Sequence, residues 1–390
     1  EIHERLVGSE MCIRDRLKTL GSVATYINGR AFKPSEWEST GLPIVRIQNL
    51  TDKNAKCHYS SAAYEEKYKI HNGDLLFAWS ASLGAHIWNQ NDAWLNQHIF
   101  KVIPNDNIDK LYLYYFLQKV IAELYLKTHG SGMVHITKGP FMNTPIPVPS
   151  YTEQFRIVAR IEELFSELDK AVDTLKTTKE QLAVYRQAVL KDAFSNIAEY
   201  IPFGKITSSR LGKMLDKQKN VGVPCKYLRN INVRWFSFDL SDLLDMKIEE
   251  KEFEKYTICK NDLVICEGGE PGRCAVWEKD ETIFYQKALH RVRFTIKAEP
   301  RFYMYYLWYI TQSGSINKFY TGTGIKHLTG QSLEKIPVPV TDIGEQKRLL
   351  ELIEMRLSVC DNIEKTVDAA LAQADAMRQS ILKQAFEGKI

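Results

Sequence analysis

The chain has no apolar run long enough to cross a membrane. Its richest apolar stretch, Phe302–Ile310, is short and contains four tyrosines. A membrane-spanning helix needs about 20 consecutive, mostly apolar residues. The sequence therefore predicts no membrane-spanning segment and no membrane partner.

Cysteine is also scarce. The 390 residues include seven cysteines, an odd number, and no two are spaced as Cys-x-x-Cys. A chain of this size can build a core without disulfides, so this usage predicts buried thiols and a reducing cytoplasm. Cys259, Cys266, Cys274 and His290 are residue types that bind zinc, but their spacing fits no common zinc module. We expect no metal site.

Sequence motifs of catalysis are missing as well. Asn143–Ile146 lacks the second proline and the aromatic residue of the Asn/Asp-Pro-Pro-aromatic motif that an amino-methyltransferase requires. No phosphate-binding Gly-x-x-x-x-Gly-Lys-Ser/Thr loop occurs. Gly268–Gly272 is glycine-rich, but Glu267 and Glu270 would repel phosphate, so this stretch predicts a tight turn between strands. We expect a chain that is not itself an enzyme and holds no cofactor.

Neither sign of charge dominates. The 52 Lys and Arg residues nearly balance the 48 Asp and Glu residues, which leaves a formal net charge of +4. This balance permits nucleic-acid binding and does not demand it. The length predicts two or three domains.

The chain is organised around a long helix predicted within residues 146–199. Pro147 and Pro149 disfavour helix before them, and Ser150 stands at the capping-box distance from Glu153. Glycine and proline are absent from Glu153 to Phe194, which predicts a rod of roughly 60 Å. Steps of three and four residues predict a narrow coiled-coil seam, made of Ile157, Ile161, Leu164, Leu168, Ala171, Leu175, Leu182, Tyr185 and Val189.

Residues 336–390 repeat this segment at a constant offset of 192 residues. Ile336–Pro339 repeats Ile146–Pro149, and Glu345-Gln346 repeats Glu153-Gln154. One rod cannot bury its own seam, so we expect two long helices packed antiparallel with pseudo-twofold symmetry. The second seam is Ile353, Ile363, Val367, Ala370, Ala374, Met377 and Ile381. Phe155, Val158, Phe165 and Val172 widen the first stripe, which favours docking of further helices.

Two globular segments precede the two rods. Residues 17–145 contain strand-like runs at Ile44–Ile47, Asp74–Ala78 and His98–Ile103, followed by an apolar helix at Leu111–Leu126. Residues 200–335 repeat this plan with offsets that drift from 181 to 192; Asn230-Ile231 corresponds to Asn49-Leu50, and Tyr305-Tyr306 to Tyr114-Tyr115. The fold class expected is α/β domains in tandem, joined by two antiparallel coiled-coil helices.

Residues 1–16 are expected to be a non-native leader. Glu10–Arg16 resembles the translation of a sequencing adapter, and the segment lacks the apolar core of a signal peptide. The native start is then expected to be missing.

The composite of motifs resembles one family. Pro147-Val-Pro149, Glu153-Gln154 and Ile161–Phe165 look like the spacer region of type I restriction-modification specificity subunits. The turns Gly130–Gly132 and Gly322–Gly324, each followed by a histidine (His135 and His327), look like the same family. For these histidines we favour structural hydrogen bonding over catalysis.

This resemblance implies a protein that reads double-stranded DNA. Its two target-recognition domains would each grip one half of a bipartite, asymmetric site, and the helices would set their spacing. Methyltransferase subunits, two of them expected, would dock along the helices, and restriction/translocase subunits would join. Adenine-N6 methylation would use S-adenosylmethionine held by the methyltransferase subunit. A four-residue insertion near Thr177-Thr178 should then change the recognised spacing.

DNA contact would need Arg, Lys, Asn and Gln on exposed loops, because these side chains read base edges and phosphates. In the first domain the candidates are Arg30, Lys33, Arg46, Gln48, Asn49, Trp79, Ser80, Ser82 and Lys138. In the second domain they are Arg210, Lys213, Lys217, Lys219, Arg229, Asn230, Asn232, Arg234, Arg273 and Lys326.

Two alternatives stay open at this point. The chain could be the specificity region of a fused restriction-methylation enzyme, which a list of neighbouring genes would distinguish. It could instead be a coiled-coil scaffold that binds no DNA, although the basic clusters in the loops argue against this.

Overall fold

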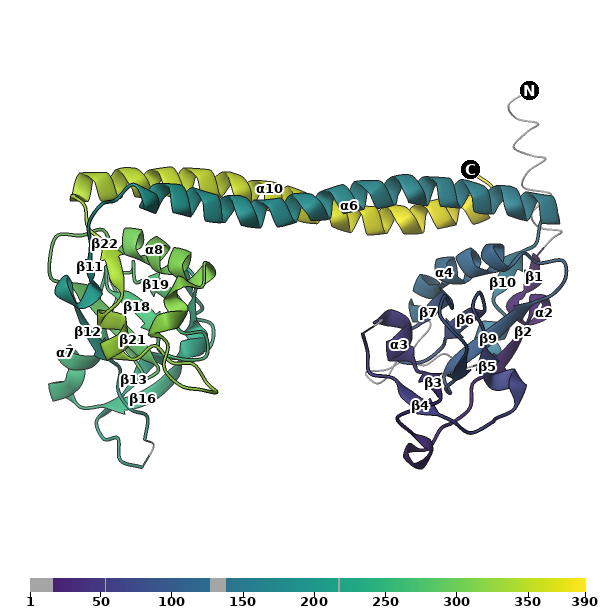
Figure 1. Cartoon of the computed structure of the whole chain (residues 1–390), viewed down its shortest axis with the longest axis horizontal. Helices are drawn as coiled ribbons and strands as arrows, with labels where there is room; N and C mark the ends of the chain where they lie inside the picture. The colour runs from purple at the N-terminus through teal and green to yellow at the C-terminus, as the bar shows by residue number, and fades with distance from the viewer. Residues whose placement is uncertain (1–16, 53, 127–137, 217) are drawn as a thin grey trace, which may run out of the picture. The chain divides into compact units, whose positions relative to one another are not determined.

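The computed structural model describes residues 17–390 except 53, 127–137 and 217. The chain divides into two units (Figure 1). The first unit comprises the described residues up to Leu175 together with Ala369–Ile390, and the second comprises Lys176–Asp368. Each unit therefore contains one globule and a part of each long helix. The predicted Gly130–Gly132 turn, His135 and Lys217 lie outside the described residues.

Two four-stranded sheets form the globule of the first unit. One is antiparallel throughout, in the order β2-β9-β6-β7. The other, in the order β4-β3-β8-β5, is mixed, because β3 and β8 run parallel. A short ladder pairs β1 with β10. The strands are β1 Leu17–Thr19, β2 Ala24–Asn28, β3 Leu42–Val45, β4 His58–Ser60, β5 Lys69–Ile70, β6 Leu75–Ala78, β7 Gly84–Ile87, β8 Ala93–Leu95, β9 Ile99–Pro104 and β10 Pro145–Pro147.

The predicted apolar helix is α4 Lys110–Leu126, and it packs on the antiparallel sheet. Its buried Tyr112, Leu113 and Phe116 share one core with the sheet and with the start of the long helix. The shorter helices are α2 Leu20–Val23, α3 Ile47–Thr51 and α5 Lys138–Met142. The predicted strand at Ile44–Ile47 was therefore wrong at its end, because Ile47 begins α3.

The second unit repeats both sheets, in the orders β12-β21-β18-β19 and β16-β13-β20-β17. It also has a hairpin, β14-β15, which packs on β18 and β19. The strands are β11 Tyr200–Pro202, β12 Thr207–Leu211, β13 Val223–Leu228, β14 Val233–Arg234, β15 Ser237–Phe238, β16 Leu244–Ile248, β17 Thr257–Ile258, β18 Leu263–Cys266, β19 Cys274–Val276, β20 Ile283–Tyr285, β21 Leu289–Phe294 and β22 Pro337–Pro339. The helices are α7 Phe253–Tyr256, α8 Pro300–Gln312 and α9 Gly330–Glu334.

Helices α6 (Tyr151–Ser195, 45 residues) and α10 (Ile343–Phe386, 44 residues) are the two predicted rods. The N–H of Glu153 donates to Ser150 Oγ at 3.4 Å, and the N–H of Glu345 donates to Asp342 Oδ1 at 3.0 Å. These bonds supply half of the predicted capping box. Both glutamates also accept hydrogen bonds from an arginine three residues later.

The two helices pack antiparallel in each unit. In the first unit, Ile157 and Ile161 share a core with Leu382 and Phe386. In the second unit, Val189 and Leu190 share a core with Ile353. Early residues of α6 thus meet late residues of α10, and late residues of α6 meet early ones, as predicted.

The seam itself follows a stricter 3-4 spacing than the apolar residues suggested. Ile157, Ile161, Leu182, Ile353 and Val367 are buried, and Leu164, Leu168, Leu175 and Ile381 are half-buried. Ile363 and Met377 are 40 % and 46 % exposed, so they lie outside the seam. The seam positions next to them hold Glu364 and Arg378, whose side chains form ion pairs across the helices. Phe165, placed outside the seam from the sequence, is buried within it.

Matching hydrogen bonds fix the correspondence between the two globules. The N–H of Arg46 donates to Asn49 Oδ1, and the N–H of Arg229 donates to Asn232 Oδ1. Asn232, and not Asn230, therefore corresponds to Asn49. The shift arises because β13 is two residues longer than β3.

The helix match is also one residue away from the one predicted. The N–H of Asp109 donates to Gln154 Oε1, and the N–H of Glu299 donates to Gln346 Oε1. This offset of 190 residues equates Tyr115 with Tyr305.

Candidate nucleic-acid interface

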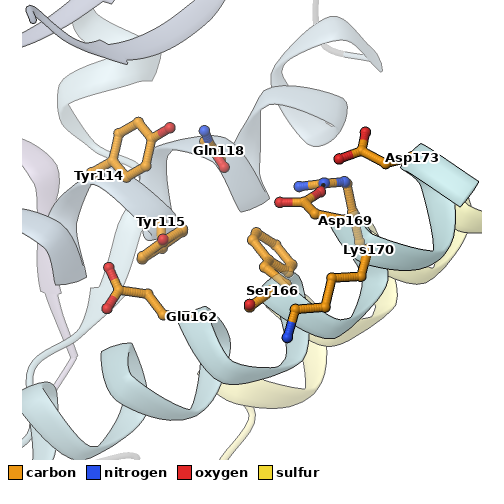
Figure 2. A pocket seen from close by; sticks show the side chains of 10 residues that line it. Tyr114, Tyr115, Gln118, Glu162, Ser166, Asp169, Lys170 and Asp173 are labelled. Atoms are coloured by element: carbon orange, nitrogen blue, oxygen red, sulfur yellow. Dashed lines mark ion pairs between the residues drawn. The ribbon is translucent and has the colours of Figure 1, made fainter.

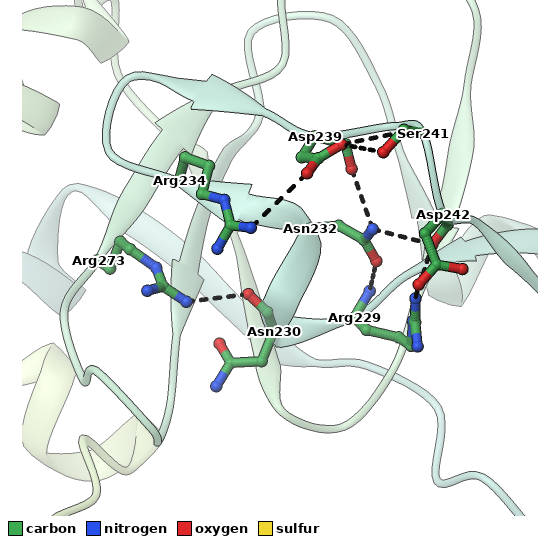
Figure 3. A network of polar contacts seen from close by, with 8 residues as sticks. All are labelled: Arg229, Asn230, Asn232, Arg234, Asp239, Ser241, Asp242 and Arg273. Atoms are coloured by element: carbon green, nitrogen blue, oxygen red, sulfur yellow. Dashed lines mark hydrogen bonds and ion pairs between the residues drawn. The ribbon is translucent and has the colours of Figure 1, made fainter. Parts of the chain in front are cut away.

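Two buried asparagines hold the loops that carry the candidate arginines. Asn49 and Asn232 are 7 % and 2 % exposed. Besides capping Arg229, Asn232 donates through Nδ2 to the carbonyl oxygens of Asp239 and Asp242, at 3.0 and 3.1 Å (Figure 3). Buried amides with all partners inside the protein stabilise a loop. These two candidates therefore position the surface and do not face DNA themselves.

The arginines around Asn232 are held by neighbouring carboxylates. Arg229 pairs with Asp242 at 2.7 Å, Arg234 with Asp239 at 3.6 Å, and Arg273 with Glu270 at 2.5 Å. Arg273 also donates to the carbonyl oxygen of Asn230 at 3.1 Å (Figure 3). These pairs fix the guanidinium groups before any ligand arrives, and a phosphate would have to compete with the carboxylates.

Arg30 and Lys213 occupy the same place in the two globules. Each backbone N–H donates to the last residue of the parallel strand, Leu95 or Tyr285. Arg30 pairs with Glu36 at 2.6 Å and lies over the ring of Tyr64. The Arg30 hydrogen bond is the main reason that the pKa of the Glu36 carboxyl is lowered. Lys213 pairs in the same way with Glu252. Both cations stabilise a loop.

Trp79 and Ser80 have internal partners as well. Trp79 Nε1 donates to Asn28 Oδ1 at 3.0 Å, and its ring stacks on Phe100. Ser80 is 3 % exposed, whereas Ser82 beside it is exposed. The Trp79 ring is thus anchored, and only Ser82 of this stretch is freely presented.

The remaining candidates lie on the surface. Arg46 is half-buried, with its guanidinium 5.8 Å from the ring of Trp37. The Lys219 side chain is 86 % exposed and stands 3.9 Å from Asp216. The fully exposed candidates are Lys33, Gln48, Lys138, Arg210, Lys219 and Lys326. These groups can meet a phosphate without a change in the fold.

The second unit has an open cleft of about 590 Å³ that sequence reasoning missed. Leu215, Tyr227 and Leu244 form an apolar floor, and Asn220 and Gln286 supply amides at its edge. The corresponding place in the first unit is closed by Trp37, whose ring stacks on His58 at 3.9 Å. His58 and Leu244 correspond, since each pairs with the residue two before the arginine. Matching the parallel strands of the two globules would have found Gln286, which follows β20.

Chemistry of the catalytic kind is not assembled in the part of the chain that the structure describes. In these residues no three His, Cys, Asp or Glu side chains gather as metal ligands. Burial raises the pKa of the Cys266 thiol to about 11, so it is a poor nucleophile. Gly268–Gly272 forms the predicted turn, between β18 and β19. No described helix is long and apolar enough to span a membrane.

Curated relatives cover nearly the whole chain. The EcoBI specificity subunit of a type I restriction enzyme from Escherichia coli is 24 % identical over 95 % of this chain and 85 % of its own length. The MjaVIII specificity subunit from Methanocaldococcus jannaschii is 23 % identical over 82 % of this chain and 80 % of its own length.

Solved structures agree on the fold. A chain from a study of complex assembly and conformational transition of the type I R-M system matches with a TM-score of 0.72 and 18 % identity, covering 96 % of this chain and 98 % of the other. The crystal structure of the HsdS subunit from Thermoanaerobacter tengcongensis matches with a TM-score of 0.53 and 17 % identity, covering 96 % and 97 %.

The sequence pattern of one family accounts for both repeats. Residues 16–182 and 230–373 match the type I restriction modification DNA specificity domain. These two segments contain most of both globules and most of both long helices. The chain belongs to the family of type I restriction-modification DNA specificity domains.

Proposed function

We propose that this chain reads a bipartite, asymmetric double-stranded DNA site, with one globule for each half-site. It is a specificity subunit, and specificity subunits of this family are not catalytic. One observation carries the proposal: the buried framework is the same in both globules while the exposed residues on it differ. Asn49 and Asn232 hold equivalent loops, yet Trp37 closes the place that lies open beside Leu244. Equal scaffolds with unequal surfaces suit two different half-sites.

The exposed cations support phosphate contact, and amides support base reading. Lys33, Lys138, Arg210, Lys219 and Lys326 need lose no internal partner beyond a weak surface pair to meet the backbone. Gln48 and Asn220 could present amides to adenine, the base that such side chains prefer. The paired arginines would then position loops, and their guanidinium groups would read guanine only where a carboxylate releases them.

The helices would dock methyltransferase subunits, two of them, and through these the restriction subunits. Met355, Val359 and Ile363 support this proposal because they recur every four residues on α10 and are 61 %, 55 % and 40 % exposed. Such a row on one helix face suits another helix. S-adenosylmethionine would be bound by the docked methyltransferase, and the complex would act in the cytoplasm.

Selection from random duplex DNA tests the reading function. The purified chain, with the methyltransferase subunit of its own system, should enrich duplexes with two short conserved blocks separated by a fixed gap. Lys219→Ala should lower the slope of log affinity against log salt by about 0.9 and keep the enriched sequence, because one phosphate contact is lost. Enrichment of no sequence by a stable complex would contradict the proposal.

A further inference from the structure

The first unit has an open pocket of about 480 Å³ between α4 and the long helices. Tyr115 of α4 and Glu162 of α6 face each other across it (Figure 2). Arg378 reaches in from α10, where it pairs with Asp169 and lies over the ring of Phe165. Glu162 makes no ion pair with any residue that the structure describes.

The corresponding place in the second unit is filled from within the chain. Glu354 corresponds to Glu162 at the offset of 192 residues, and Arg301 lies 2.6 Å from its carboxylate. Phe236, from the tip of the β14-β15 hairpin, packs on Tyr305 and Trp308 with ring distances of 5.0 and 4.9 Å. An arginine and an aromatic ring therefore occupy this site in the second unit.

Both of these groups are missing at the first site. The residue that corresponds to Arg301 is Leu111, and the one that corresponds to Trp308 is Gln118. The described part of the first unit has no hairpin equivalent to β14-β15. Tyr115 nevertheless keeps the conformation of a packed residue, since it is 9 % exposed and burial raises its pKa to about 12.

The charges of the two sites are opposite. The first pocket has three carboxylates, from Glu162, Asp169 and Asp173, against the two cations of Lys170 and Arg378. The second site has two carboxylates, from Glu354 and Asp361, against three cations, from Arg186, Arg301 and Lys365. Aromatic rings and carboxylates around a gap are the surroundings that stabilise a guanidinium group.

We propose that the pocket of the first unit receives an arginine side chain, next to an apolar residue, from a methyltransferase subunit. This inference rests on the proposed function, since it names the contact through which that subunit docks. Arg301 and Phe236 are the internal version of the same contact. The two halves of the chain would therefore bind the methyltransferase unequally, and only the first would depend on this arginine.

Charge reversal at Glu162 tests the contact. The full chain is mixed with the methyltransferase subunit of its own system, and native mass spectrometry counts the bound subunits. Glu162→Lys should weaken one of two binding steps by on the order of tenfold or more, or about 1.4 kcal/mol, and leave the other unchanged. Glu163→Lys is the matched control, because Glu163 is a neighbour on α6 that pairs with Arg160 outside the pocket.

A second variant guards against misfolding. Leu111→Arg supplies to the first unit the cation that Arg301 provides in the second, so it should weaken the same binding step. The thermal transitions of all variants are compared. If Glu162→Lys and Leu111→Arg, both folded, bind as the wild type does, the inference is overturned and the proposed function stands. If the wild-type chain binds no methyltransferase, both are overturned.

Discussion

Arg186 of α6 donates to Asp361 of α10 at 2.7 Å, and this ion pair occurs a second time with the helices exchanged. Arg378 is the residue 192 positions after Arg186, and it pairs with Asp169, which lies 192 positions before Asp361. The first pair belongs to the second unit and the second pair to the first unit. The repeat therefore reproduces a contact across the helices as well as a sequence, and the contact occurs only in an antiparallel register.

The first prediction concerns this register. Arg186→Asp should destabilise the chain by about 1–2 kcal/mol, because a mostly buried cation loses two carboxylate partners and meets a like charge. Adding Asp361→Arg should restore part of this loss, with a coupling energy of about 1 kcal/mol. Urea denaturation of the four chains of this double-mutant cycle measures it. Purely additive losses would show that the pair does not define the register.

The second prediction concerns the junction between globule and helix. Gln154 is buried; its Oε1 accepts from the Asp109 N–H at 2.8 Å, and its Nε2 donates to the Pro149 carbonyl oxygen at 3.0 Å. Gln154→Leu should lower the free energy of unfolding by about 2–3 kcal/mol, because buried backbone groups lose their partners. The corresponding Gln346→Leu should do the same.

The exposed Gln379→Leu is the control for these variants, and it should change the free energy of unfolding by less than about 0.5 kcal/mol. Differential scanning calorimetry reports both transitions. A change at Gln154 no larger than that at Gln379 would contradict a structural role for the buried amide.

The third prediction concerns pH. Burial lowers the pKa of His290 below its ordinary value of 6.5, and its Nε2 lies 2.9 Å from the Leu328 carbonyl oxygen. The unfolded state then binds the proton more tightly than the folded state. The stabilisation is present above pH 6.5 and is lost as the pH falls below it, by at most about 1.4 kcal/mol per pH unit.

Urea denaturation between pH 7.5 and 5.5 checks this sign. His290→Gln should lose less stability over this range than the wild type, because glutamine does not titrate. If the two chains lose equal stability, His290 contributes nothing to the acid sensitivity.

The sequence predicted what repeats and what lies at regular spacing. The helices α6 and α10, their antiparallel pairing and α4 follow from uninterrupted apolar periodicity and from the offset of 192 residues. The turn at Gly268–Gly272 follows from glycine between two strand patterns. Local pattern is enough in these cases, because each element buries a face that its own residues define.

The sequence did not predict contacts that depend on distant charges. Glu364 and Arg378 occupy seam positions because carboxylates and guanidinium groups meet them from the other helix. Apolar Ile363 and Met377, one residue earlier, were taken for the seam. In the candidate interface, the buried caps Asn49 and Asn232 could not be told from exposed base readers, because burial of an amide is set by the fold around it. Which residues contact DNA stays a prediction.

The central claim is that each globule reads its own half-site, and a methylome tests it most directly. Residues 17–390 are expressed with the methyltransferase subunit of the same system, and the host DNA is sequenced for methylated adenine. The account predicts one bipartite motif with a fixed gap. Replacing residues 201–335 by the corresponding globule of another family member should change one half of that motif and keep the other half and the gap. An unchanged motif, or a change in both halves, would contradict it.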